Sequence, residues 1–226
     1  FVPTFRRWIA SLKSRPRILL EPFAGGGIIS LTALFENLVE RVVMVELDDE
    51  VAAVWETVVN GDAEWLANRI LTFPMTREAV EEELQKPSTT KREKAFQTIL
   101  KNRTLHGGIL AEGSRFIRHG ENGKGIGSRW YAKTLAQRLI NLNHIVGRID
   151  FRCDDGLKVM MEFASREDAI YFIDPPYTAG GKKAGKRLYK HHQIDHEYLF
   201  TICESLVGDF VMTYDEAEEV KEMARR

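Results

Sequence analysis

The sequence predicts an α/β fold with a mostly parallel, twisted sheet flanked by helices. The main observation is a set of short, continuously apolar runs, which are typical of strands buried on both faces of a parallel sheet. These runs cover residues 17–21, 41–47, 169–174 and 209–213, and a weaker, more alternating run covers 148–153. Helical patterns follow the first two runs, at 28–38 and 50–60. Parallel neighbours require crossover helices of this kind, which supports the assignment.

The middle of the chain has a different organisation. Helical patterns recur there without an intervening strand, at residues 65–73, 77–85, 91–105 and 130–144. Between the last two, residues 106–128 are rich in glycine and charged side chains. We therefore expect residues 1–73 and 147–226 to form one sheet-containing domain and residues 74–146 to form an insert within it.

Composition limits the classes of protein to consider. With 226 residues, 44% of them hydrophobic, the chain can bury one α/β core and an insert. No apolar run approaches the roughly 18 residues that a membrane helix needs. Cys153 and Cys203 match neither a metal-binding nor a disulfide spacing, and Phe1-Val2-Pro3 does not begin a secretion signal. We expect a cytoplasmic protein without a membrane partner, and a longer chain beyond both ends of this sequence.

A glycine-rich turn follows the first predicted strand. The segment Glu21-Pro22-Phe23-Ala24-Gly25-Gly26-Gly27 lies where that strand ends and a helix begins. Glycines there allow positive φ angles and a close approach of the backbone to a ligand. Glu46, followed by Leu47, ends the next strand, where a carboxylate can bind both hydroxyls of a ribose. The turn lacks the Lys-Ser/Thr ending of a phosphate-binding loop and fits either a dinucleotide or S-adenosyl-L-methionine.

A second motif, Asp174-Pro175-Pro176-Tyr177, ends the predicted strand at 169–174. Ligands of parallel sheets bind beyond the carboxyl ends of the strands, so this motif and the glycine-rich turn should face one crevice. The Asp174 carboxylate and the Pro175 carbonyl can accept both hydrogens of an aromatic amine, which is a poor nucleophile because its lone pair is delocalised. Tyr177 can stack on the base that carries the amine. This motif favours S-adenosyl-L-methionine over a dinucleotide.

Together, these segments resemble the Dam-like, adenine-specific DNA methyltransferases in which the cofactor motif precedes the catalytic motif. The resemblance implies a Rossmann-like methyltransferase with a helical and loop-rich target-recognition insert. It also implies methyl transfer from S-adenosyl-L-methionine to the exocyclic amino group of an adenine flipped out of double-stranded DNA. A restriction endonuclease partner and the oligomeric state stay open.

The family pattern assigns roles to individual residues. Asp174, Pro175, Pro176 and Tyr177 take the catalytic place. The family also has an acid shortly before the catalytic strand that contacts the cofactor adenine, and we prefer Asp155 to Asp154 for it because a glycine follows Asp155. The predicted cofactor contacts are Glu21, Pro22, Phe23, Ala24, Gly25, Gly26, Gly27, Glu46, Leu47, Asp154, Asp155 and Asp174. The segment 209–214 resembles the later strand that walls the base pocket.

Positive charge is concentrated in the predicted insert although the whole chain has a net charge of −1. Basic residues there, interleaved with aromatic side chains and glycines, suit contacts to phosphates and base edges. A second basic stretch follows the catalytic motif, with Gly180-Gly181 as a hinge for a closing loop. The predicted nucleic-acid contacts are Arg103, Arg115, Arg118, Lys124, Arg129, Lys182, Lys183, Lys186, Arg187 and Lys190.

Two other functions remain compatible with the sequence. One is methylation of an adenine or guanine amine in RNA. A small appended RNA-binding domain would favour that function, whereas the large insert with its basic residues favours a DNA target. The other is a non-catalytic nucleic-acid-binding subunit, against which the intact motifs argue. His191, His192 and His196 lack a Cys or acidic ligand set, so we predict no metal site.

Overall fold

The computed structural model describes residues 1–110, 113–120, 123–176, 194–214 and 218–225. The described residues form two compact units, which divide at Asp48/Asp49 and at Gly147/Arg148. We call Phe1–Asp48 together with the described residues from Arg148 onward the sheet unit, and Asp49–Gly147 the helical unit. No described helix is long and apolar enough to cross a membrane.

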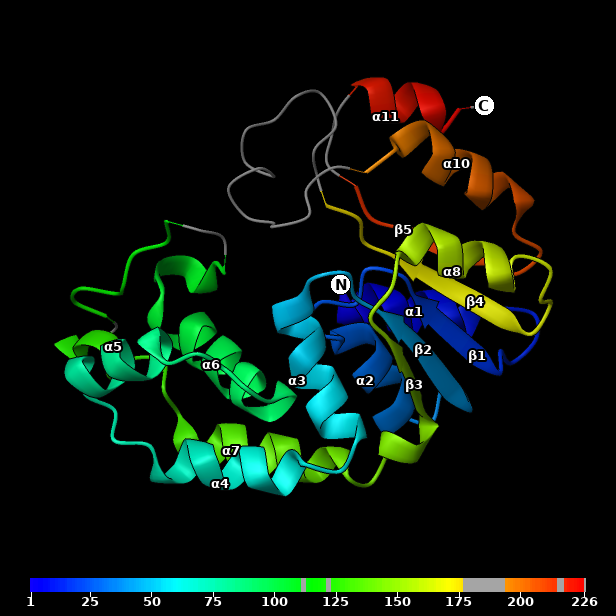
Figure 1. Ribbon diagram of the computed structural model, residues 1–226. Helices are drawn as coiled ribbons and strands as arrows, with labels where there is room; N and C mark the ends of the chain where they lie inside the picture. The colour runs from blue at the N-terminus through cyan, green and yellow to red at the C-terminus, as the bar shows by residue number, and fades with distance from the viewer. Residues whose placement is uncertain (111–112, 121–122, 177–193, 215–217, 226) are drawn as a thin grey trace. The chain divides into compact units, whose positions relative to one another are not determined.

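The sheet unit contains the predicted parallel sheet. Its five strands among the described residues are β1 (Ile18–Glu21), β2 (Arg41–Val45), β3 (Ile149–Arg152), β4 (Ala169–Ile173) and β5 (Phe210–Met212). The order is β3-β2-β1-β4-β5, and every neighbouring pair is parallel (Figure 1). All predicted strands are therefore confirmed, including the weaker run that became β3.

Helices cover both faces of this sheet, which explains why its central strands are continuously apolar. They are α1 (Val2–Ser11), α2 (Ile28–Phe35), α8 (Gly156–Phe163) and α10 (His196–Ser205), and α11 (Glu218–Met223) follows β5. Side chains of α8 and α10 share one buried cluster with alternate residues of β1, β2 and β4, such as Leu20 and Tyr171. On α1, the ring of Phe5 meets the ring of Phe172 in β4 at 6.1 Å between centroids.

The strand order places a topological switch between β1 and β4. From β1 the chain proceeds to β2 on one side, and β4 lies on the other side with Leu20 beside Tyr171. The loops after β1 and β4 therefore leave the sheet at adjacent carboxyl ends. In open parallel sheets this is where ligands bind.

The helical unit is built from α3 (Asp49–Val59), α4 (Ala63–Thr72), α5 (Arg77–Gln85), α6 (Lys91–Thr104) and α7 (Ala132–Leu142). Thr90 is the N-cap of α6 and forms a capping box with Glu93. The two side chains satisfy backbone N–H donors at the start of the helix. Phe73, Phe96 and Trp130 form an aromatic centre, with ring centroids 5.3 to 6.4 Å apart.

The compact helical unit begins earlier than the insert we expected at residue 74. Helix α3 packs on α6, and α4 packs on α7, as Figure 1 shows for the latter pair. Ala53 on α3 and Leu66 and Ile70 on α4 are buried with Phe96 and Leu100 of α6. Later helices of the same unit therefore cover these apolar side chains.

Candidate active site and DNA-binding surface

The carboxyl ends of neighbouring strands carry the predicted site residues of the sheet unit. Asp155 follows β3, Glu46 follows β2, Glu21 ends β1 and leads into the glycine-rich turn, and Asp174 follows β4. Because β3, β2, β1 and β4 are adjacent in this order, the structure brings these residues to one edge of the sheet.

The glycine-rich turn is fixed to the end of β2. The Ala24 N–H donates to the Val45 carbonyl at 2.9 Å, and the Gly25 N–H donates to the Glu46 carboxylate at 2.9 Å. Gly25 has a φ of +48°, and a Cβ atom there, or on Gly26, would meet no heavy atom within 4 Å. The turn therefore leaves open space above its backbone, as a cradle for a ligand requires.

The Glu46 carboxylate is held by backbone donors on both oxygens. Besides Gly25, the Asp48 N–H donates to it at 2.8 Å. Burial raises the pKa of Glu46, while the hydrogen bonds from Asp48 and Gly25 oppose that rise. Each oxygen keeps acceptor capacity for a further donor, because an ionised carboxylate offers about four lone-pair sites. The adjacent Leu47 is exposed.

The carboxylate of Asp174, which follows β4, is held by a residue that follows the neighbouring strand β5. The Thr213 hydroxyl donates to the Asp174 carboxylate, and the Thr213 N–H donates to the Ile173 carbonyl at 2.9 Å. The segment 209–214, which we predicted to line the base pocket, thus contacts the predicted catalytic motif through the hydrogen bond from Thr213 to Asp174. The sequence analysis did not single out Thr213. Pro175 is buried, and Pro176 is partly buried.

Glu21 is a buried carboxyl group in the same region. It is 3% exposed and accepts hydrogen bonds from the Ser30 N–H, at 3.1 Å, and from the Ser30 hydroxyl. Burial raises the pKa of Glu21 to about 7, the Ser30 hydrogen bonds act against that rise, and the negative charge of Asp174 adds to it. The two carboxyl groups are therefore electrostatically coupled.

The carboxylates of Asp154 and Asp155 have different hydrogen-bond partners. Asp154 pairs with Lys158 at 2.7 Å, and this partner holds the pKa of Asp154 below its usual value. Asp155 is exposed and caps α8 by accepting from the Leu157 N–H at 2.8 Å. At the next position, a Cβ on Gly156 would clash with the carbonyl oxygen of Pro22, so the start of α8 lies directly against the glycine-rich turn.

A comparison of the sequence with protein families identifies the family of the chain. The model of the D12 class N6 adenine-specific DNA methyltransferases matches residues 5–226. The chain belongs to this family. No curated protein matches the chain. The predicted resemblance is confirmed, and the chain is a DNA adenine methyltransferase with a parallel α/β sheet.

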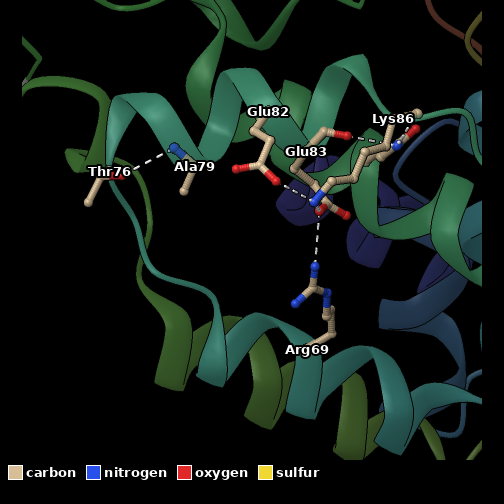
Figure 2. A network of polar contacts seen from close by, with 7 residues as sticks. Arg69, Thr76, Ala79, Glu82, Glu83 and Lys86 are labelled. Carbon is tan, nitrogen blue, oxygen red and sulfur yellow. Dashed lines mark hydrogen bonds and ion pairs between the residues drawn. The ribbon is translucent and has the colours of Figure 1, made fainter.

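In this methyltransferase, the cations of the helical unit fall into two groups. From Arg69 to Lys101, basic side chains pair with acids, as Arg69 on α4 does with Glu83 at 3.0 Å and Lys86, directly after α5, does with Glu82 at 3.0 Å (Figure 2). Four further pairs join Lys91 to Glu56, Arg92 to Asp62, Lys94 to Asp49 and Lys101 to Glu50. Arg77 pairs with Glu81 within α5.

Beyond Lys101, the described part of the helical unit contains no further ion pair. The unpaired basic residues are Arg103, Arg115, Arg118, Lys124, Arg129, Lys133 and Arg138. A short antiparallel contact brings Arg115 and Arg118 to the end of α6, since the His106 N–H donates to the Arg115 carbonyl at 2.8 Å and Leu105 bridges Phe116. The change from paired to unpaired cations coincides with the predicted nucleic-acid-binding segment.

The loop after residue 118 is closed by its own backbone and contains the 3₁₀ turn η3 (Gly125–Gly127). The Gly125 N–H donates to the His119 carbonyl at 3.0 Å, and a Cβ on Gly120 would clash with the Gly125 carbonyl and the Ser128 side chain. Two other 3₁₀ turns, η1 (His106–Gly108) and η4 (Val146–Arg148), follow α6 and α7.

Several predicted residues lie outside the described part of the chain. These are Tyr177, the hinge glycines Gly180 and Gly181, and Lys182, Lys183, Lys186, Arg187 and Lys190. Their assignments stay predictions. Among the described residues, no group of three or more His, Cys, Asp or Glu side chains is arranged to hold a metal ion.

Proposed function

We propose that S-adenosyl-L-methionine is the methyl donor and binds across the glycine-rich turn at the carboxyl ends of β2, β1 and β4. The observation that carries this proposal is the Gly25–Glu46 hydrogen bond, which places an acceptor carboxylate beside a turn with open space above Gly25 and Gly26. Glu46 would accept the ribose hydroxyls, and Asp155, beside the turn, would contact the adenine moiety. The bound cofactor supplies an electrophilic methyl group.

The catalytic residues act on the amine. We propose that the Asp174 carboxylate and the Pro175 carbonyl accept the two amine hydrogens of a flipped adenine, and that Tyr177 stacks on its ring. Thr213 restricts the rotation of the Asp174 carboxylate through their hydrogen bond. Holding the nitrogen in line with the methyl carbon, about 3 Å away, converts an encounter into an effectively unimolecular step. Catalysis by this chain is then mainly positioning and electrostatic stabilisation.

The helical unit supplies DNA binding in this proposal. Its unpaired cations, from Arg103 to Arg138, contact phosphates, and neighbouring side chains of the insert read base edges. The support is the contrast with the paired cations before Arg103, because a cation already bound to a carboxylate has less to gain from a phosphate. Recognition of duplex DNA with one extruded base follows from the need to expose the amine.

A single-turnover experiment tests these roles together. The protein is mixed with S-adenosyl-L-methionine carrying a labelled methyl group and with duplex DNA, and the nucleosides are analysed for N6-methyladenine. We expect Glu46→Ala to weaken cofactor binding, and Asp174→Ala to slow transfer while much of the cofactor affinity survives. Parental transfer by Asp174→Ala, or label on cytosine with the unmodified protein, would contradict the assigned mechanism.

A further inference from the structure

Tyr214 follows Thr213 directly and is held by two side chains of α10. The Tyr214 hydroxyl and the Nδ1 atom of His196, the first residue of α10, form a hydrogen bond, and the two ring centroids lie 5.6 Å apart. Phe200, one turn further along α10, meets the Tyr214 ring at 6.0 Å between centroids. The residue after Thr213 is therefore attached to α10 by a polar contact and by an aromatic contact.

Helix α10 is a firm support for His196. Asp195 caps the helix by accepting from the Tyr198 N–H at 2.9 Å, which fixes the first turn, where His196 lies. Leu199 and Ile202 on the same helix are buried in the cluster that includes residues of β4. The imidazole of His196 therefore belongs to an element that is packed on the sheet.

The end of β5 gains from such a support. This strand has three residues and is the last in the order of the described sheet, where it pairs with β4. Beyond the strand, the Thr213 N–H still donates to the Ile173 carbonyl at 2.9 Å, and Tyr214 is the next residue. The Tyr214 side chain thus restrains the chain at the point where the Thr213 hydroxyl donates to the Asp174 carboxylate.

Apolar packing alone does not explain the contact between Tyr214 and His196. The Tyr214 ring lies against a small apolar cluster that contains Val220 and Met223 of α11 and Phe200 of α10. A phenylalanine would fill the same space, because it differs from tyrosine only by the hydroxyl group. A hydrogen bond has a preferred direction, which apolar packing lacks, so the contact with His196 orients the Tyr214 ring more closely than packing does.

We propose that His196 is a positioning residue for methyl transfer. Its hydrogen bond with Tyr214 holds residues 213–214 so that the Thr213 hydroxyl donates to the Asp174 carboxylate. The proposal rests on the proposed function, in which that carboxylate accepts an amine hydrogen, and adds a residue of α10 that acts without touching the amine. Transfer depends on holding the reacting groups in line, so a loosely held Asp174 carboxylate slows the reaction.

Tyr214→Phe removes the hydrogen bond and keeps the ring. Methyl transfer is measured in a single turnover with saturating S-adenosyl-L-methionine and duplex DNA, and cofactor affinity is measured by calorimetry. We expect the transfer rate to fall roughly three- to tenfold, as the loss of one typical hydrogen bond allows, with cofactor affinity within about twofold of the parent. Tyr198→Phe is the matched control, because it removes a hydroxyl from an exposed ring of the same helix and should keep the parental rate.

Two replacements of His196 separate its hydrogen bond from its bulk. The amide of asparagine can place a polar atom near the position of Nδ1, whereas leucine has similar bulk and no polar atom. We expect His196→Leu to lose as much rate as Tyr214→Phe, and His196→Asn to transfer at least about half as fast as the parent. Urea unfolding of each variant sets the conditions in which it is fully folded, and the rates are compared there.

A double variant tests whether the effect passes through Asp174. Thr213→Val already frees the Asp174 carboxylate, so adding Tyr214→Phe should lower the rate by less than about twofold more. A residue that only stabilises the fold would lower the rate by the same factor with Thr213 or with Val at this position.

The outcomes separate this proposal from the proposed function. Tyr214→Phe at the rate of Tyr198→Phe overturns the role of His196, and so does a loss in His196→Asn equal to that in His196→Leu. A full further loss on adding Tyr214→Phe to Thr213→Val also overturns it. Parental transfer by Asp174→Ala, in contrast, overturns the proposed function itself.

Discussion

Gly156 packs directly on the backbone of Pro22: a Cβ atom at this glycine would clash with the Pro22 carbonyl oxygen and lie 3.0 Å from the carbonyl carbon. The first turn of α8 and the glycine-rich turn therefore meet backbone to backbone. Asp155 caps the same turn of α8 through the Leu157 N–H. The contact fixes where the Asp155 carboxylate lies relative to the proposed cofactor cradle.

Gly156→Ala should disturb both the fold and the cofactor site. The extra methyl group forces the start of α8 away from Pro22, and overpacking of this kind costs about 1–3 kcal/mol of stability. We expect a lower urea midpoint and at least about tenfold weaker cofactor binding by calorimetry, with Asp155 displaced. Gly147→Ala is the control, because its Cβ would meet no atom within 4 Å. Parental affinity and stability in Gly156→Ala would show that the contact is unimportant.

Glu46→Gln tests the ribose contact without a change in size. The amide keeps one acceptor oxygen, but its NH₂ group faces one of the two backbone donors, Gly25 or Asp48, that now bind the carboxylate. Loss of charged acceptors costs on the order of 1.5–3 kcal/mol, or roughly ten- to a hundredfold in affinity. Glu40→Gln is a control at the amino end of the same strand, where Glu40 is exposed and pairs with Arg17. Equal affinities in the two variants would remove Glu46 from the site.

Much of the sheet could be predicted from the sequence because burial on both faces produces continuous apolar runs. The run at 41–47 became β2, which ends at Val45, two residues short of the predicted limit. Helix α8 was not predicted, although Asp155 is a typical N-cap and buried apolar residues such as Leu157 and Met160 follow it. The short length of α8 and its first residue, Gly156, weaken that signal.

The contacts that complete the site depend on tertiary pairing, which a single sequence does not contain. Thr213 and Asp174 are 39 positions apart, and their hydrogen bond follows from β5 pairing with β4. The helical unit begins at Asp49 and not at residue 74, and this start also depends on tertiary contacts. An amphipathic helix such as α3 shows that it has an apolar face, but not that α6 covers it.

Stability should depend on pH through Glu21. The folded state raises the pKa of Glu21 to about 7 from 4.5, so proton binding favours the folded state and stability falls as pH rises through this window. The full effect is on the order of 3 kcal/mol. Glu21→Gln cannot ionise and should gain stability over the parent between pH 5 and pH 8, measured by urea unfolding at both values. An identical pH dependence in variant and parent would exclude this role.

The salt dependence of DNA binding should report the unpaired cations. Replacing Arg115, Arg118 and Lys124 together with Ala should weaken duplex binding and lower the slope of log affinity against log salt by about one unit per lost phosphate contact. Lys91, Arg92 and Lys94 form a control set of the same charge, whose members pair with acids in the same unit. Their replacement by Ala should leave the slope close to that of the parent. Equal slopes for both triple variants would place the DNA surface elsewhere.

The hydrogen bond from Thr213 to Asp174 gives a prediction for catalysis itself. Thr213→Val keeps the side-chain shape but removes the donor, so the Asp174 carboxylate can rotate away from the orientation in which it accepts an amine hydrogen. We expect the single-turnover rate to fall by about ten- to a hundredfold, because a hydrogen bond to a charged group contributes about 1.5–3 kcal/mol, and cofactor affinity to stay within about twofold of the parent. Asp174→Ala should fall further, by several orders of magnitude. Thr201→Val is the matched control, because the Thr201 hydroxyl donates only within α10, to the Glu197 carbonyl at 2.9 Å. If Thr213→Val transfers methyl groups at the rate of Thr201→Val, the orientation of Asp174 does not depend on β5.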